Sequence, residues 1–563
     1  MTVKQATPAP EPVAKSGAQI LVDSLEAQGV DIIFGYPGGA IMPVYDVLPK
    51  SNLTHILGRH EQGCGMAAIG YARATGKVGT CLATSGPGAT NLVTSIADAF
   101  LDSVPVVFIT GQVTSDLMGT DAFQEVDIFG ITLPVVKHSY IARDPADIPG
   151  MVAEAYFIAA EGRPGPVLID LPKDVANAMT TERHRWRPYP KVKPEMGESA
   201  EIAQAEKLIR EAKKPLLYIG GGIAQGDGVT ELRDLIERTK IPSVSTLKGL
   251  GALPSDHPDF LGMLGMHGLK AANYAVQECD LLIVAGARFD DRATGKLDTF
   301  APHAKVIHMD IDRAEINKLR KVDVGLEGSL KKNLNALNPG DLDIEDWRTL
   351  CFDRRTEHEW DYNAPGTGVY APKLLHDLSR RAPESAIFTC DVGQHQMWVA
   401  QHCYFDDPKD HITSGGLGTM GFGVPAGLGA KIGCPDRTVI TVSGDGSIMM
   451  NIQELATLNR YGIPLKIVLL DNSALGMVRQ WQEVFFDKNY SEVNLDDNPD
   501  FAKVAEAFQI EGFTVRTRDE VDAGIDRLLE AKGPILMHVK IDPNENVWPL
   551  VPPGRSNADM MER

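Results

Sequence analysis

The chain has 563 residues, a formal net charge of -20 and 43% hydrophobic residues. At roughly 100–200 residues per domain this length predicts two to five domains, and three is the natural count. The acidic charge disfavours nucleic acid and anionic membranes as partners, and apolar runs far below the roughly 20 residues of a membrane span predict no membrane helix.

Residues 1–14 form a polar, proline-containing stretch without an apolar core, so we expect a disordered leader there rather than a signal peptide. It carries no arginine, which makes it a poor organelle transit peptide. The seven cysteines form no CxxC pair, which argues for a reducing compartment and against structural disulfides or a zinc site. Together these features favour a cytoplasmic location.

Short runs rich in Val and Ile recur between helix-length segments along residues 15–180, which is typical of buried parallel strands. These runs begin at residues 31, 80, 104 and 166. A polar, proline-containing stretch at 180–199 interrupts the pattern and predicts a linker. Residues 15–180 are therefore expected to form a first α/β domain.

The same pattern returns twice. Runs at 215, 241, 280 and 305 predict a central domain over 199–340, and runs at 386, 438, 465 and 535 predict a third domain over 369–545. A lapse between them at 338–368 predicts a second linker, and 546–563 is expected to be a tail. Three doubly wound parallel sheets with right-handed crossovers are the simplest fold, with ligands beyond the carboxyl ends of the strands.

In the first domain, Glu61 follows a predicted strand and begins a helix of small residues. One interpretation is a helix N-terminal glutamate stabilised by the helix dipole. The other is a carboxyl group that exchanges a proton in a dry pocket, as general acid–base catalysis requires. The spacing alone favours neither interpretation over the other.

In the third domain, an apolar run ends in Gly444-Asp445-Gly446, and a second run leads to Asn472. Because parallel strands end at one sheet edge, a carboxylate and an amide oxygen are expected side by side there. These are ligands that suit Mg²⁺, which takes the rest of its shell from water and phosphates. The glycines allow phosphates to approach the backbone, and a following helix would offer its N-terminus to them.

These motifs resemble the thiamine diphosphate enzymes, whose signature is GDG, about thirty residues and then two asparagines. Here Asp471 replaces the first asparagine, but only the second is a metal ligand in that family. Longer motifs narrow this resemblance to one family: the chain from about residue 15 to 552 is similar to the catalytic subunits of acetohydroxyacid (acetolactate) synthases. These motifs are RHEQG at 59, SGPGATN at 85, GTDAFQE at 119, LPKDV at 171, ARFDDR at 287, DVGQHQMW at 391, SGGLGTMGFG at 414 and ALGMVRQW at 474.

The resemblance implies thiamine diphosphate and Mg²⁺ as cofactors. The implied metal ligands are Asp445, Asn472 and the backbone carbonyl of Ala474, and Met420 is implied to be an apolar wedge beneath the bent cofactor. Glu61 would hydrogen-bond the aminopyrimidine ring and promote loss of the thiazolium proton. Further residues implied around the cofactor are Gly393, Gln394, His395, Gly444, Gly446, Ser447 and Met477.

The resemblance also implies FAD in the central domain, with a structural rather than a redox role. The implied contacts follow the predicted strands there: Gly220, Gly221, Gly222, Thr246, Leu247, Gly265, Met266, His267, Arg288 and Asp310. A glycine triplet after a strand is a weak signal by itself, because such triplets often only close a turn.

The implied reaction decarboxylates pyruvate and joins the remaining hydroxyethyl carbanion to pyruvate or 2-ketobutyrate, in branched-chain amino acid biosynthesis. Arg292 is implied to bind the acceptor carboxylate and Trp481 to favour 2-ketobutyrate, with Phe123, Gln124 and Lys173 lining the same channel and Gln124 touching the intermediate. A homodimer or homotetramer with active sites at the subunit interface is expected, and a small regulatory subunit is a further expected partner.

Two other functions stay open at this point. One is another pyruvate-consuming thiamine enzyme, such as a flavin-dependent pyruvate oxidase or an FAD-free catabolic acetolactate synthase, although ARFDDR and Trp481 argue against it. The other is a nucleotide-binding regulatory or scaffold protein with a degenerate site. Intact Glu61, Asp445 and Asn472 argue against that function.

Overall fold

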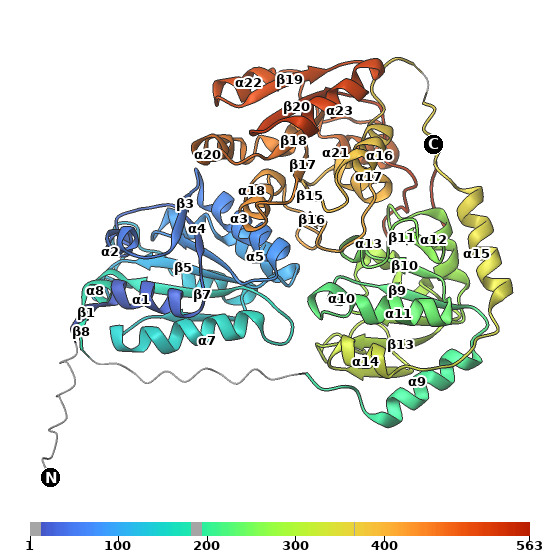
Figure 1. The fold of residues 1–563 in the computed structure, drawn as a ribbon, viewed down its shortest axis with the longest axis horizontal. Helices are drawn as coiled ribbons and strands as arrows, with labels where there is room; N and C mark the ends of the chain where they lie inside the picture. Colours follow the sequence, from blue (N-terminus) through green and yellow to red (C-terminus); the bar gives the residue numbers. More distant parts are fainter. Residues whose placement is uncertain (1–12, 182–193, 365, 563) are drawn as a thin grey trace, which may run out of the picture. The chain divides into compact units, whose positions relative to one another are not determined.

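The computed structural model describes residues 13–181, 194–364 and 366–562 (Figure 1). These residues fall into two compact units: residues 13–68, 78–161 and 165–181 form the first, and the other described residues form the second. Most of the expected leader (1–14) and of the first expected linker (180–199) lies outside the described residues. The domain boundaries expected from the sequence stay predictions.

The first unit is built on a six-stranded parallel sheet with the strand order β3-β2-β4-β5-β7-β6. Its apolar core packs between this sheet and its helices, and helix α1 packs against α7. The strands are β2 (Ile32–Gly35), β3 (Thr54–Leu57), β4 (Gly79–Ala83), β5 (Val106–Gln112), β6 (His138–Ile141) and β7 (Val167–Pro172). The main helices are α1 (Gly17–Ala27), α3 (Glu61–Thr75), α5 (Val93–Leu101) and α7 (Ile148–Ala160).

The second unit contains two six-stranded parallel sheets, of which the central one has the order β11-β10-β9-β12-β13-β14. Its strands are β9 (Pro215–Ile219), β10 (Ser243–Ser245), β11 (Phe260–Met263), β12 (Leu281–Ala285), β13 (Lys305–Asp310) and β14 (Val324–Glu327). Helices of this part include α9 (Ser199–Glu211), α11 (Val229–Thr239), α12 (Lys270–Glu278), α14 (Leu330–Ala336) and α15 (Glu345–Glu357).

The third sheet has the order β16-β15-β17-β18-β20-β19. Its strands are β15 (Ile387–Cys390), β16 (His411–Thr413), β17 (Val439–Gly444), β18 (Lys466–Asp471), β19 (Glu511–Val515) and β20 (Ile535–Lys540). Its helices include α16 (Ala371–Arg381), α17 (Gln394–His402), α18 (Gly423–Gly433), α21 (Gly476–Phe485), α22 (Phe501–Ala507) and α23 (Val521–Glu530). Glycine-rich α18 packs against β15 and β17.

The strand orders identify where ligands can bind. Numbered within each sheet, the first and third sheets share the order 2-1-3-4-6-5, whereas the central sheet has the order 3-2-1-4-5-6. The order reverses between β2 and β4, between β9 and β12, and between β15 and β17, and ligands of such sheets bind in the crevice at these points. The predicted fold of three doubly wound parallel sheets is confirmed.

Two features of the whole chain complete the description. Among the described residues no helix combines the length and the apolar character needed to cross a membrane. All seven cysteines are free, and all but Cys434 are buried.

Candidate functional site

Two side chains with oxygen ligands lie at the ends of neighbouring strands in the third sheet. Strands β17 and β18 pair in register so that Gly444 lies opposite Leu470, which places Asp445 and Asn472 just beyond the same edge. Both side chains are buried, with 3% and 7% exposure. Burial, together with the negative charge of Asp471, raises the pKa of Asp445 to about 7, and a bound divalent cation would favour the charged form of this carboxyl group.

Amide groups hold these two side chains in place. Asn498 donates a hydrogen bond of 3.0 Å from Nδ2 to Oδ2 of Asp445. Asn472 donates from Nδ2 to Oε1 of Gln394 (3.1 Å), and its Oδ1 accepts the backbone N–H of Ala474 (3.2 Å). The predicted residues Gln394, Asp445, Asn472 and Ala474 therefore gather at one place, and Asn498 joins them from a loop that the sequence did not single out.

The turn after β15 lies beside them. A Cβ on Gly393 (φ 152°) would lie 2.8 Å from the ring of His395, and one on Gly444 would lie 2.7 Å from it, so both positions leave room only for glycine. The ring Nε2 of His395 is buried and has no hydrogen-bond partner among the described residues. Burial lowers the pKa of His395 to about 3, so the ring is neutral. An unpartnered ring nitrogen beside glycine backbone fits a bound diphosphate.

A buried carboxylate orders the loop that carries Met420. Oδ1 of Asp391 accepts the backbone N–H groups of Gly421 (2.8 Å) and Phe422 (3.2 Å), and Oδ2 accepts the hydroxyl of Ser443 (2.9 Å). The Met420 methyl group lies 3.7 Å from where a Cβ on Gly446 would stand. Met420 thus lies next to the GDG turn, and Asp391 is a site residue that sequence reasoning missed.

The remaining predicted residues of this site lie on two helices, α19 and α21. The helix after Gly444, α19 (Asp445–Ile448), has only four residues, so the expected helix N-terminus is a single turn. The Ser447 hydroxyl donates to the carbonyl of Val392 (2.6 Å). Met477 and Trp481 lie half-buried on α21, where the Trp481 ring meets Phe485 edge to face at 5.7 Å.

In the first unit, Glu61 begins α3 and faces a second helical segment. Its Oε2 accepts a hydrogen bond of 2.9 Å from Nδ2 of Asn91, and a Cβ on Gly88 would lie 3.3 Å from its Oε1. Gly86 (φ 58°) lies so close to Gln124 that a Cβ on it would meet the Gln124 Cα at 2.9 Å. The structure therefore brings Glu61 and Gln124 to the same loop, and Asn91 is an additional partner that sequence reasoning missed.

Phe123 and Lys173 are exposed at this edge of the first sheet. The Phe123 side chain is 89% exposed, and Lys173 begins helix α8 (Lys173–Asn177) directly after β7. The carboxylate of Glu125 folds the loop before Phe123, because it accepts backbone N–H groups from Gly119, Thr120 and Ala122. Phe123 is thus an exposed apolar side chain that follows an ordered loop.

A buried carboxyl group beside this loop gives a pH-dependent prediction. Asp170 on β7 accepts hydrogen bonds from Thr110 (2.7 Å) and Gln112 (3.0 Å), and burial raises its pKa from the ordinary 3.8 to about 7. Between these values the folded chain keeps a proton that the unfolded chain releases. The free energy of unfolding therefore falls as the pH rises through this window, by up to about 4 kcal/mol, and stays low above it.

Asp170→Asn keeps the size of the side chain and removes its charge. The difference in the free energy of unfolding in urea, variant minus wild type, should be more positive at pH 8 than at pH 5, which means that the variant gains stability relative to the wild type. Parallel pH profiles for the two proteins would show that Asp170 does not titrate in this way.

In the central sheet, the residues predicted around FAD lie at the carboxyl ends of five neighbouring strands, β11, β10, β9, β12 and β13. A Cβ on Gly220 would lie 2.1 Å from the Gly286 carbonyl, and one on Gly222 would lie 2.9 Å from Gly286. Close packing of two loops at the reversal point thus requires these glycines even without a ligand. Burial lowers the pKa of His267 to about 4 and raises that of Asp310 to about 6, so near neutral pH His267 is uncharged and Asp310 is mostly ionised.

Arg292 lies beyond β12, and its side chain is 60% exposed. Its Nε is 3.5 Å from Oδ2 of the exposed Asp291, and its Nη1 is 3.5 Å from the sulfur of Met266. Such an exposed ion pair is weak. The guanidinium therefore stays able to bind a carboxylate from solution, as the predicted acceptor role requires.

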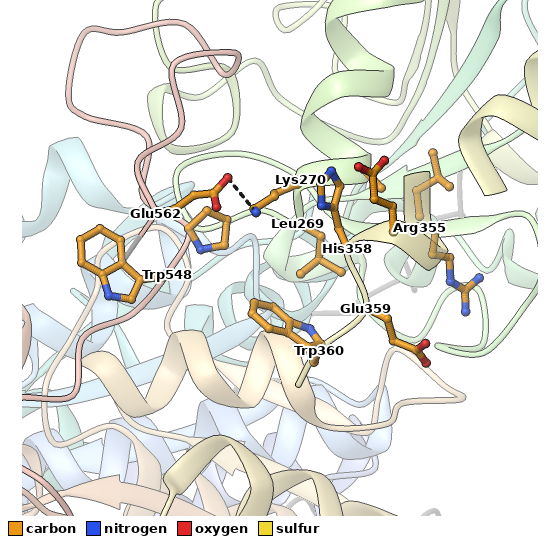
Figure 2. Close-up of a pocket in the computed structure, with 12 residues that line it drawn as sticks. Leu269, Lys270, Arg355, His358, Glu359, Trp360, Trp548 and Glu562 are labelled. Atoms are coloured by element: carbon orange, nitrogen blue, oxygen red, sulfur yellow. Dashed lines mark ion pairs between the residues drawn. The ribbon is translucent and has the colours of Figure 1, made fainter. Parts of the chain in front are cut away.

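A cavity of ≈ 270 Å³ lies elsewhere in the second unit, between α12, the end of α15 and the C-terminal segment (Figure 2). Trp360 and Trp548 contribute aromatic surface to it, and Lys270 pairs with Glu562 at 2.7 Å. None of the predicted site residues lines this cavity.

Comparison with protein families matches three parts of the chain to thiamine pyrophosphate (thiamine diphosphate) enzymes. The N-terminal TPP binding domain matches residues 15–131, the central domain matches 202–337, and the C-terminal TPP binding domain matches 391–539. Each match includes the loops at the point where the strand order of one sheet reverses.

Individual relatives match over nearly the full length. The chain is 57% identical over 549 residues to the acetolactate synthase isozyme 2 large subunit of Escherichia coli K12, covering 97% of this chain and 100% of the relative. It is 50% identical over 576 residues to the acetolactate synthase large subunit of Parasynechococcus marenigrum, covering 100% and 93%. An acetolactate synthase of Arthrospira platensis is 47% identical over 576 residues, with 97% of both chains covered.

Proposed function

The chain belongs to the acetolactate synthases, a family of thiamine diphosphate-dependent enzymes, and we propose that it joins pyruvate to a second 2-keto acid for branched-chain amino acid synthesis. Thiamine diphosphate supplies the nucleophilic carbon and the electron sink for decarboxylation. The protein positions the reactants and excludes water. The structural observation that supports the proposal is the buried pair of Asp445 and Asn472 beside the ring nitrogen of His395, which has no hydrogen-bond partner among the described residues.

For the metal we propose Mg²⁺, held by Asp445, Asn472 and the carbonyl of Ala474. The support is a buried carboxyl group whose pKa is raised by burial and by the charge of Asp471, and an amide fixed by Gln394. The diphosphate would lie against Gly393, His395, Gly444, Gly446 and Ser447, where glycine backbone leaves room for it.

For the other end of the cofactor we propose Glu61 and Met420 as the acting residues. Glu61 would hold the proton that the aminopyrimidine ring exchanges, with Asn91 fixing its second oxygen. Met420 would support the bent cofactor from the loop that Asp391 orders. Gln124 would contact the reacting groups, since it lies next to Gly86 in the same loop region as Glu61.

We propose FAD for the central sheet, in a structural role because the overall reaction transfers no electrons. The strand order 3-2-1-4-5-6 is that of dinucleotide-binding sheets, and the candidate residues lie at its carboxyl edge.

Omission of any one of the three cofactors from the apoprotein should abolish acetolactate formation. Full activity without flavin would instead indicate an FAD-free catabolic enzyme.

The acceptor is proposed to be pyruvate or 2-ketobutyrate. Exposed Arg292 would bind its carboxylate, because a planar guanidinium is a bidentate donor. Phe123 and Lys173 are proposed to line the acceptor channel, from which water must be excluded before the acceptor arrives. Trp481, next to Phe485 on α21, offers an aromatic surface for the extra methyl group of 2-ketobutyrate.

Trp481→Leu should reduce the preference for 2-ketobutyrate over pyruvate and keep acetolactate synthesis. One methylene group is worth about 1–3 kcal/mol, so the ratio of the two products should fall by about tenfold or more. Competition between both keto acids in one tube measures this ratio, with Val478→Ala on the same helix as a control for general disturbance. An unchanged ratio would mean that the Trp481 ring does not contact the acceptor.

For assembly we propose a homodimer or homotetramer whose active sites lie at subunit interfaces. The 89% exposed Phe123 supports this, because a partner chain would cover an apolar side chain at the site. Two relatives are described as large subunits, so a small regulatory subunit is proposed as an additional partner. Seven free cysteines support residence in a reducing compartment such as the cytoplasm.

A further inference from the structure

The C-terminal segment, defined here as residues 547–562, contacts the loop that carries Met266 and His267. The backbone N–H of Val551 donates to the Met266 carbonyl (2.8 Å), and Nδ1 of neutral His267 donates to the Pro549 carbonyl (3.3 Å). Glu562, near the end of the segment, pairs with Lys270 at the start of α12 (Figure 2). The segment is therefore held mainly at Pro549 and Val551, because the ion pair near its end is half-exposed and weak.

The same segment holds the acceptor loop, defined here as residues 290–296, through residues that follow Arg292. Asn557 donates from Nδ2 to the Ala293 carbonyl (3.0 Å), and the backbone N–H of Lys296 donates to the Arg555 carbonyl (2.8 Å). The Arg292 carbonyl accepts the N–H of Met266 (2.8 Å). These backbone contacts fix the position from which the mostly exposed Arg292 side chain extends.

Asn557 is the side chain at the centre of this contact. It is fully buried (0% exposed), and its amide is the side-chain donor that reaches the residue after Arg292. Gly295 (φ 56°) lies against the same place: a Cβ there would be 2.6 Å from the Arg555 carbonyl and 2.9 Å from Oδ1 of Asn557. The segment and the acceptor loop are thus packed too closely for any side chain at position 295.

The segment also holds the helix that carries Trp481. Gln480, which is 0% exposed, accepts the N–H of Val547 at Oε1 (2.9 Å) and donates from Nε2 to the Val547 carbonyl (2.8 Å). One short segment therefore fixes the backbone next to Arg292 and the residue next to Trp481.

We propose that Asn557 is a positioning residue for the acceptor 2-keto acid: it holds the acceptor loop so that the Arg292 guanidinium meets the acceptor carboxylate. This proposal rests on the acceptor role proposed above for Arg292. Asn557 touches neither substrate nor cofactor in this role. Its loss should therefore weaken use of the second keto acid and spare the decarboxylation of the first.

Asn557→Ala tests this separation. The KM for 2-ketobutyrate at saturating pyruvate should rise about tenfold, the effect expected from loss of one buried hydrogen bond. The burst of CO₂ from pyruvate alone in a single turnover should stay within about twofold of the wild type, because the donor step needs no acceptor. A general loss of structure would reduce the CO₂ burst as well. If Asn557→Ala impairs the burst and the use of 2-ketobutyrate to the same extent, the proposal is overturned.

Three further variants make the test decisive. Glu562→Gln removes the exposed ion pair of the same segment and should change neither measurement. Gly295→Ala should raise the acceptor KM by displacing the acceptor loop from the other side, and it serves if Asn557→Ala does not fold. Arg292→Ala should raise the acceptor KM more than either. If Arg292→Ala raises the acceptor KM while Asn557→Ala and Gly295→Ala leave it unchanged, positioning by the segment is wrong. An unchanged acceptor KM in Arg292→Ala overturns the role of Arg292 and this proposal together.

Discussion

Glu61→Gln should still bind thiamine diphosphate but lose most of its acetolactate synthesis, by about 10²–10⁴-fold, the usual contribution of a positioned acid–base group. The amide has nearly the size of the carboxyl group and can still accept the hydrogen bond from Asn91. It cannot exchange the proton that the aminopyrimidine ring must lose and regain. Initial rates of acetolactate formation measure the effect.

Cofactor binding separates this result from unfolding. Quenching of tryptophan fluorescence by thiamine diphosphate should be close to that of the wild type, and Glu154→Gln on α7 provides a control variant in the same unit with normal activity expected. Turnover near the wild-type value in Glu61→Gln would remove Glu61 from its proposed role.

Asp445→Ala should weaken Mg²⁺ and thiamine diphosphate binding together, because Asp445 would hold the ion that offsets the charge of the diphosphate. The loss of affinity should exceed the roughly 10–100-fold that follows from removing an outer partner of a metal ligand. Excess Mg²⁺ should restore part of the binding. Calorimetric titration of the cofactor at several Mg²⁺ concentrations measures both effects.

Two comparisons sharpen this prediction. Asn498→Ala removes the amide that holds Oδ2 of Asp445 and should give a smaller loss of the same kind. Asp497→Ala, an exposed neighbour, should leave binding unchanged. If Asp445→Ala binds thiamine diphosphate normally in the presence of a chelator, the metal assignment is wrong.

The sequence predicts interior strands far better than edge strands. Each of the twelve apolar runs that it offers coincides with one of the four interior strands of a sheet, such as β17 and β18. Edge strands have only one paired neighbour and shorter apolar runs, as in β16 (His411–Thr413), so their sequences resemble loops. Of the six edge strands, the sequence indicated only β3, and it did so through the motif at Glu61 that follows this strand.

The candidate site shows a similar limit. Motif residues such as Asp445 and Asn472 can be located from the sequence because each directly follows a recognisable strand. Asp391, Asn91 and Asn498 could not, because each acts through a partner at least 30 residues away in the chain: Gly421 for Asp391, Glu61 for Asn91, and Asp445 for Asn498. Only the fold shows that these buried polar groups share hydrogen bonds.

Product analysis with [2-¹³C]pyruvate tests the central claim most directly. Purified protein with thiamine diphosphate, Mg²⁺ and FAD should convert two molecules of pyruvate into one of acetolactate and one of CO₂, with no oxygen uptake. Carbon NMR would follow the labelled product, and an oxygen electrode would run beside it. Oxygen consumption with acetate or acetyl phosphate as the product would contradict the account in favour of a pyruvate oxidase, and failure to consume pyruvate would contradict it in favour of a protein without this activity.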